Sequence, residues 1–316
     1  MKILKVKAIA PVRLDNYLMQ QFPSLGLGKL NKALRENKIK LNGKKQPLST
    51  RVAAGDEIKL FILDDQLDTP ARGGGAAWRS AHGPAEVIYN GPQMMVANKP
   101  AGLPVDGADD DTLLNRALLY LAGQGEYAEN SNYTPALCHR LDTGTSGLLL
   151  IAKTPEAEEA LTAAIKSREI KKTYVCVTFG RPVPPDAMLE GYLVKDAERG
   201  IVKIVDERQP GAREVETRYE TIAVSGRLAL LKVELITGRT HQIRAHMASI
   251  GCPILGDSKY GNNAANRELR LKYQALCAWE LTLPRFTQPE LAPLSGKTFR
   301  APKPWYYEQI IDGTLK

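Results

Sequence analysis

The sequence predicts an α+β protein with a mixed or antiparallel sheet, on three observations. Apolar, β-branched runs typical of strands recur at residues 94–97, 147–152, 173–179 and 229–235. The helical patterns between these runs do not alternate regularly with them, as they would in a parallel α/β fold. The chain has 316 residues, 43% of them hydrophobic and 25% charged, which is enough for two globular domains.

The excess positive charge lies in the first fifth of the chain. Residues 1–62 hold 13 Lys and Arg against 4 Asp and Glu, whereas the other residues hold 30 against 31. This asymmetry favours a small polyanion-binding domain joined to a nearly neutral body. A lysine-rich solubilising face would give the same counts, so both interpretations stay open.

Residues 1–62 have the pattern of two helices packed on a small sheet. The apolar helix positions are Leu14, Leu18, Leu30, Ala33 and Leu34, and the basic positions opposite the second stripe are Lys29, Lys32 and Arg35. Asn42 and Gly43 predict a tight turn between strands, and Ile58, Leu60 and Ile62 alternate along a last strand. Residues 63–84 have no periodicity and a glycine triplet, so we expect a linker there and a second domain over residues 85–316.

Membrane insertion and a disulfide framework are not expected. No stretch approaches the run of about 18 apolar residues that a spanning helix requires, and the first residues lack the apolar core of a signal peptide. The cysteines lie far apart without a CxxC motif, at Cys138, Cys176, Cys252 and Cys277. This spacing argues against structural zinc and predicts a reducing, cytoplasmic environment.

The stretch HRLDTGTSGLLLIAK, residues 139–153, places one carboxylate directly before a strand. Residues 147–152 are apolar on both faces, which predicts a strand inside the sheet, and the turn before such a strand holds a reactive group rigidly. Asp142 is the acid in this turn. It could equally cap the turn through its side chain, with Thr143, Thr145 and Ser146 as turn formers.

A second group of polar residues lies in TGRTHQIRAHMASIGCPILGD, residues 237–257. We expect Thr240 to cap a helix that ends at Gly251. His241 and Arg244 would share one face of it, and Arg239 would lie at its entrance, where exposed amide groups favour a phosphate. An amphipathic surface helix with solvated bases would explain the same pattern.

Four motifs together resemble the RluA family of pseudouridine synthases. They are NKPAGLPV, HRLDTGTSGLLLIAKT, KKTYVCVTFG and the stretch from TGRTHQIRAHM to GCPILGDSKYG, at residues 98–105, 139–154, 171–180 and 237–261. Residues 1–62 resemble the alpha-L RNA-binding motif through Arg13-Leu14-Asp15, Leu18 and the helix that carries Lys29. One departure is Asp106, where the family often has histidine.

The resemblance implies the isomerisation of specific uridines in RNA by one essential carboxylate, with neither cofactor nor metal. It assigns catalysis to Asp142, Tyr174 and Arg244, whose guanidinium would favour the ionised carboxylate. The target base must leave its stack, and Arg140 would fill the gap. The remaining expected contacts are His139, Arg239, Thr240, His241 and Gln242 for the substrate, and Arg13, Lys29, Lys32, Arg35 and Lys44 for RNA.

We therefore expect an RNA pseudouridine synthase of the cytoplasm, a monomer acting on 23S ribosomal RNA. Two alternatives belong to other classes. A non-catalytic RNA-binding or ribosome-assembly factor would not need Asp142, Tyr174 and Arg244 together. A nucleoside or sugar hydrolase would release free base and would use paired carboxylates.

Overall fold

The computed structural model describes residues 2–6, 12–22, 30, 33–34, 36–61, 77–107, 109–129, 131, 133–196 and 200–316. The chain divides into two compact units, Met1–Ser80 and Ala81–Lys316. Of the expected linker at residues 63–84, residues 63–76 lie outside the described residues. Its next four residues form a short 3-10 helix, η1 (Ala77–Ser80), in which Trp78 is buried.

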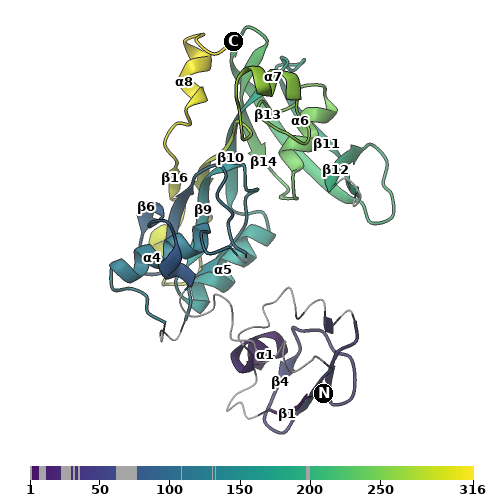
Figure 1. The fold of residues 1–316 in the computed structure, drawn as a ribbon, viewed down its shortest axis with the longest axis vertical. Coiled ribbons are helices and arrows are strands. Elements are labelled where there is room, and N and C mark those ends of the chain that lie inside the picture. Colours follow the sequence, from purple (N-terminus) through teal and green to yellow (C-terminus); the bar gives the residue numbers. More distant parts are fainter. Residues whose placement is uncertain are drawn as a thin grey trace. The chain divides into compact units, whose positions relative to one another are not determined.

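The first unit holds a three-stranded antiparallel sheet and a two-stranded one (Figure 1). Its elements are β1 (Lys2–Lys5), β2 (Val12–Arg13), α1 (Leu14–Gln21), β3 (Ile39–Leu41), β4 (Arg51–Val52) and β5 (Glu57–Leu60). Leu14 and Leu18 are fully buried in its core, as expected for one face of α1. Asn42 and Gly43 have positive φ angles of 49° and 77° and form the expected turn after β3.

The second unit is built on an eleven-stranded mixed sheet, which confirms the predicted fold class. Its strands are β6 (Glu86–Asn90), β7 (Met94–Lys99), β8 (Ala136–Leu137), β9 (Ser146–Ala152), β10 (Lys171–Phe179), β11 (Asp186–Asp196), β12 (Ile201–Val205), β13 (Arg213–Ser225), β14 (Leu228–Leu235), β15 (Leu276–Thr282) and β16 (Thr298–Arg300). The main order is β12-β11-β13-β14-β10-β15-β9-β7-β6, with β16 on β15 and β8 on β9. Only the pairing of β9 with β15 is parallel among these described strands.

Short helices flank this sheet (Figure 1). They are α4 (Leu113–Gly123), α5 (Pro155–Lys166), α6 (Gln242–Ser249), α7 (Asn263–Glu268), η2 (Ala292–Leu294) and α8 (Tyr306–Ile311). Thr154 caps α5 by accepting a hydrogen bond from the amide of Ala157, and Pro155 follows at the first helical position, as predicted. Helix α5 packs against β9, whereas α6 packs against β12 and β13 in the other half of the sheet. No helix of the described residues is long and apolar enough to span a bilayer.

Strand β9 lies inside the sheet, between β15 and β7, and this fixes the position of the stretch that precedes it. Residues 147–152 are buried without exception, as predicted for a strand covered on both faces. Gly147 has a φ of 108°, and a Cβ atom there would lie 2.2 Å from the carbonyl oxygen of Ala278. Glycine is therefore required at this point, since β15 approaches the start of β9 backbone to backbone.

Candidate active site

Asp142 lies in the turn that enters β9, and its carboxylate is not used to cap that turn. The turn is closed instead by the backbone of Asp142, whose carbonyl accepts a 3.0 Å hydrogen bond from the amide of Thr145. The buried ammonium group of Lys99 supports this turn. It donates to the carbonyl oxygens of Pro100, Leu103 and Thr143 at 2.8–2.9 Å. The Asp142 side chain is thus free to point into the cleft, where 23% of it is exposed.

The Asp142 carboxylate pairs with a buried arginine of helix α6, which packs on the other half of the sheet. Arg244 Nη1 donates to Asp142 Oδ2 at 2.7 Å, and only 6% of the Arg244 side chain is exposed. The remaining guanidinium nitrogens hold Asp257, with Nε and Nη2 donating to its two oxygens at 2.6 and 2.9 Å. One guanidinium therefore joins two carboxylates that come from separate loops.

Asp257 is fully buried and has four hydrogen-bond donors around it. Besides Arg244, the backbone amides of Lys259 and Tyr260 donate to Asp257 Oδ1 at 2.9 and 3.1 Å. Burial alone would raise the pKa of Asp257, but the hydrogen bonds and charge of Arg244 outweigh burial and lower it. Burial likewise opposes the charge on Arg244, yet its bonds to Asp257 and Asp142 raise its pKa.

Tyr174 projects from β10 into the same cleft as Asp142. The two residues line one cavity of about 900 Å³ together with Arg244. Tyr174 is buried, and burial together with the charge of Asp142 raises the pKa of its hydroxyl. The phenol is therefore protonated at neutral pH. Lys172, two residues earlier on the same face of β10, also lines the cleft.

His241 stands next to Asp142, with its Nε2 atom 3.7 Å from Asp142 Oδ2. Its Nδ1 atom lies 3.0 Å from the hydroxyl of Tyr260. Burial lowers the pKa of His241, and the positive charge of Arg244 lowers it further against the opposing effect of Asp142. The imidazole is therefore neutral at physiological pH and can exchange hydrogen bonds with a substrate at the cleft wall.

The expectation that Thr240 caps the helix is wrong. Helix α6 begins at Gln242, and its N-cap is His241, in a left-handed conformation with a φ of 57°. The entrance is organised by Gln242, whose Oε1 accepts from Thr237 Oγ1 at 2.8 Å and from the amide of Arg239 at 3.1 Å. These contacts fold the chain back on itself before the helix starts.

The substrate-contact candidates occupy different depths in the cleft. Arg239 and Thr240 are exposed at its rim, whereas Gln242 is 2% exposed. The side-chain amide nitrogen of Gln242 donates to the carbonyl of Glu216 and to Thr217 Oγ1. The bonds of Gln242 are thus made inside the protein, so it positions the loop. His139 also lines the cleft, and its Nε2 accepts from the amide of Leu150.

Arg140 is also exposed. Its guanidinium lies at the cleft, 72% exposed, with Nη2 3.0 Å from Asp106 Oδ1. Asp106, the position where the chain departs from the family motif, is thus the partner of Arg140. The sequence comparison with the family gave no reason to expect this contact.

The expected RNA contacts of the first unit are only partly described. Lys29, Lys32 and Arg35 lie outside the described residues. Arg13 forms a two-point ion pair with Asp15, at 3.0 Å from Nε and 2.7 Å from Nη2, and half of its side chain is exposed. Lys44 is exposed and follows the turn at Asn42 and Gly43.

The sequence prediction did not include three residues that hold the cleft together, Asp257, Tyr260 and Lys99. The first two fall in the GDSKYG segment that helped to define the family resemblance, so their presence there was the available signal. Lys99 lies in NKPAGLPV, and its burial could not be anticipated because isolated lysines are rarely buried. Burial lowers the pKa of Lys99 to about 7 against the opposing charge of Asp142.

The charge pattern of the cleft limits its chemistry. Asp142 is the single acidic side chain among the described residues that line it, and the basic ones are Arg140, Lys172, Arg239, Arg244, Lys259 and Lys272. Asp257 lies behind Arg244 with no exposed surface, so it cannot act as a second catalytic acid. The described residues contain no group of three or more His, Cys, Asp or Glu that could hold a metal ion. A polyanion and one nucleophilic or basic carboxylate fit this arrangement.

Comparison with known proteins agrees with this geometry. A family model described as RNA pseudouridylate synthase matches residues 93–249. Ribosomal large subunit pseudouridine synthase C of Rickettsia bellii is 35% identical over 274 residues, covering 83% of this chain and 86% of its own. An uncharacterized RNA pseudouridine synthase of Mycoplasma pneumoniae is 30% identical over 322 residues, covering 99% and 98%.

A solved structure shares the fold. Human RNA pseudouridylate synthase domain containing 4 aligns with a TM-score of 0.58 at 23% identity, covering 76% of this chain and 96% of that one. At this identity the alignment shows a shared fold alone, and the assignment of roles to side chains depends on the site itself.

Proposed function

Because the chain belongs to the family of RNA pseudouridine synthases, and is therefore an enzyme that isomerises uridines in RNA, we propose that Asp142 is its catalytic carboxylate. One observation carries this assignment. Asp142 is the acid of a basic cleft, and it pairs with a buried arginine at 2.7 Å beside a buried tyrosine. We propose large-subunit ribosomal RNA as the substrate, after the name of the Rickettsia relative.

The reaction requires no second carboxylate. Pseudouridine formation breaks the bond between the ribose and nitrogen 1 of uracil and rejoins the same base through carbon 5, so no atom enters or leaves. Asp142 either attacks as a nucleophile or removes a proton to release the base. In both cases the carboxylate must start ionised, and the guanidinium of Arg244 stabilises that charge.

Tyr174 contacts the uracil in this proposal, because it projects from β10 and lines the same cleft as Asp142. Its raised pKa argues against a preformed phenolate base. Any transfer of the proton from carbon 5 to this hydroxyl must therefore be coupled to loss of the hydroxyl's own proton. We also assign Arg140 to the gap left by the displaced base, and its exposed position at the cleft supports this.

The remaining residues bind the RNA backbone in this proposal. Arg239 at the rim and Lys172 within the cleft are cations that face the space where phosphates next to the target would lie. The first unit supplies further phosphate contacts through Lys44 and the basic residues 29, 32 and 35. We also propose that the protein works as a monomer in the cytoplasm, where ribosomal RNA and reduced cysteines are found.

Asp142→Asn tests the catalytic assignment. The variant keeps size and hydrogen-bonding ability but loses the charge, so pseudouridine formation on unmodified ribosomal RNA should fall below detection. RNA affinity should stay within several-fold of wild type, because one carboxylate in a basic cleft does not attract phosphate. Pseudouridine is measured by mapping modified uridines in the RNA after incubation, and any turnover by the variant contradicts the assignment.

The same assay separates the alternatives. A non-catalytic RNA-binding protein would leave every uridine unchanged even with the wild-type chain. A hydrolase would release free uracil, which chromatography of the supernatant detects. Wild-type conversion without free uracil is the outcome that the single-carboxylate cleft predicts.

A further inference from the structure

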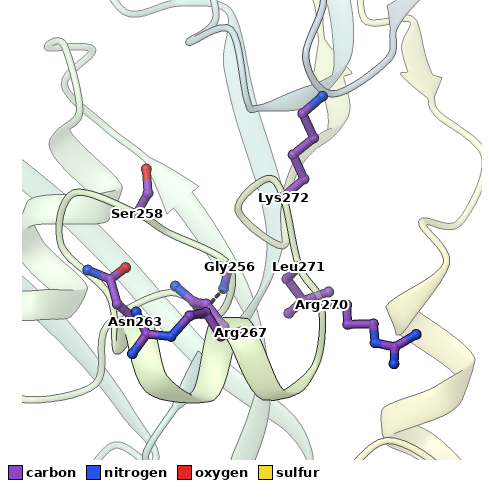
Figure 2. Close-up of a pocket in the computed structure, with 8 residues that line it drawn as sticks. Gly256, Ser258, Asn263, Arg267, Arg270, Leu271 and Lys272 are labelled. Atoms are coloured by element: carbon purple, nitrogen blue, oxygen red, sulfur yellow. Dashed lines mark hydrogen bonds between the residues drawn. The ribbon is translucent and has the colours of Figure 1, made fainter.

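A second pocket adjoins the catalytic cleft. It has a volume of about 400 Å³, and its polar lining comes from Ser258, Asn263, Asn266, Arg267, Arg270 and Lys272 (Figure 2). These residues belong to α7 and the segments on either side of it. Ser258 and Lys272 also line the cleft that holds Asp142, so the two cavities are neighbours that share these residues.

The charge of this pocket is wholly positive. Arg267, Arg270 and Lys272 line it and no acidic side chain does. None of the three forms an ion pair with a carboxylate of the described residues. In a second domain whose basic and acidic residues nearly balance, three cations without acidic partners mark a local anion-binding surface.

The cations are spread along the pocket and do not converge on one point. Figure 2 shows Arg267 and Arg270 extending in opposite directions, with Lys272 projecting in a third. This arrangement does not converge on one small anion. A chain of anions with regular spacing fits it better, as a nucleic-acid backbone does.

The floor of the pocket is fixed to the catalytic ion pair. Buried Asn266 accepts a 2.7 Å hydrogen bond from the amide of Gly256, drawn in Figure 2, and donates to the carbonyl of Asp257 at 3.1 Å. The Asp257 side chain in turn holds Arg244. The segment that presents the cations is therefore held to the same residues that position Asp142.

We propose that this pocket binds the sugar–phosphate backbone of the RNA strand next to the target uridine. The proposal rests on the proposed function for the identity of the ligand. A strand whose base enters the cleft passes Lys272 and Ser258, and its neighbouring phosphates then meet Arg267 and Arg270. The pocket extends the contact beyond the nucleotide that reacts, and its contacts go to phosphates, so they carry no base specificity.

The test is the salt dependence of binding to a single-stranded oligouridylate, with the full-length chain. Each phosphate neutralised on a single strand contributes about 0.7 to the slope of log K against log salt. In Arg267→Gln/Arg270→Gln the slope should therefore fall in magnitude by about 1.4, and by about 0.7 in each single variant. Arg267→Lys/Arg270→Lys keeps both charges and should keep the wild-type slope.

Arg208→Gln/Arg285→Gln is the matched control, because it removes the same charge from exposed arginines that line neither cavity. An unchanged slope in the pocket variant, or an equal drop in the control, overturns the proposal. An equal fall of the slope in Arg267→Lys/Arg270→Lys also overturns it, because this variant keeps both charges and the fall would indicate a structural role. Pseudouridine formation by the wild-type chain is measured separately, so its absence would refute the proposed function and leave this binding result standing.

Discussion

Asp257→Asn should strongly destabilise the second unit, although Asp257 does not reach the cleft. The wild-type carboxylate is fully buried and accepts hydrogen bonds from Arg244 Nε and Nη2 and from the amides of Lys259 and Tyr260. An asparagine side chain offers one carbonyl oxygen and places an NH2 group where the second acceptor stood. At least one of the four donors is then left without a partner, at a cost of about 1–3 kcal/mol.

The lost charge adds to this cost. Arg244 is 6% exposed, and removing one partner of a buried ion pair costs about 3–5 kcal/mol in total. Arg244 keeps its bond to Asp142, so the guanidinium should shift toward that carboxylate. A misplacement of about 1 Å at a reacting group can cost about a hundredfold in rate. We therefore expect the free energy of unfolding to fall by about 3–5 kcal/mol. We expect kcat to fall about a hundredfold.

Asp111→Asn provides the matched control. Asp111 also accepts two hydrogen bonds from one arginine, Arg116, at 2.7 Å each, but both side chains are partly exposed and lie away from the cleft. Its loss should cost about 1 kcal/mol or less. Urea unfolding of the second unit and single-turnover pseudouridine formation give the two readouts. Equal destabilisation by both variants, or normal kcat in Asp257→Asn, would refute the reasoning.

Three further predictions concern single groups. Tyr174→Phe should bind RNA as wild type but form pseudouridine more slowly, since it loses only the hydroxyl; full single-turnover activity would remove that group from the chemistry. Asp106→Asn should tighten RNA binding several-fold, because it removes a negative charge and releases Arg140, and weaker binding in a filter assay would show that Asp106 instead positions Arg140. Burial lowers the pKa of His139 to about 3 and of His246 to about 4, so the unfolded chain binds more protons below pH 6.5. The free energy of unfolding should thus fall as the pH is lowered from 6.5 toward 4.5, by up to about 1.4 kcal/mol per pH unit for each imidazole. A melting temperature that does not change over this pH range would contradict the prediction.

The elements with local signals were predictable from the sequence. Residues 147–152 form a buried strand because an uninterrupted apolar run of that length can be covered on both faces. Helix α5 begins at Thr154 and Pro155 because capping and fixed φ act within one turn. The mixed sheet follows from the irregular order of such elements, although the order of its strands has no local signature.

The entrance of α6 could not be predicted, because it depends on contacts with a distant strand. Gln242 bonds to Glu216 and Thr217 on β13, more than twenty residues away in sequence, and this anchors the chain before the helix. A capping rule that considers neighbouring residues alone selects Thr240 and misses this. The pairing of Arg140 with Asp106 has the same origin, since it joins two loops that only the fold brings together.

The second carboxylate on Arg244 has a physical reason in the proposed reaction. In that reaction Asp142 loses its negative charge, whether it bonds to the substrate or accepts a proton. A guanidinium with Asp142 as its only partner would then be left buried and unpaired during the reaction, at a cost comparable to breaking a buried ion pair. Asp257 takes no part in bond making and remains ionised behind the arginine, as its lowered pKa indicates. Arg244 can therefore stay in place while the charge on Asp142 disappears and returns.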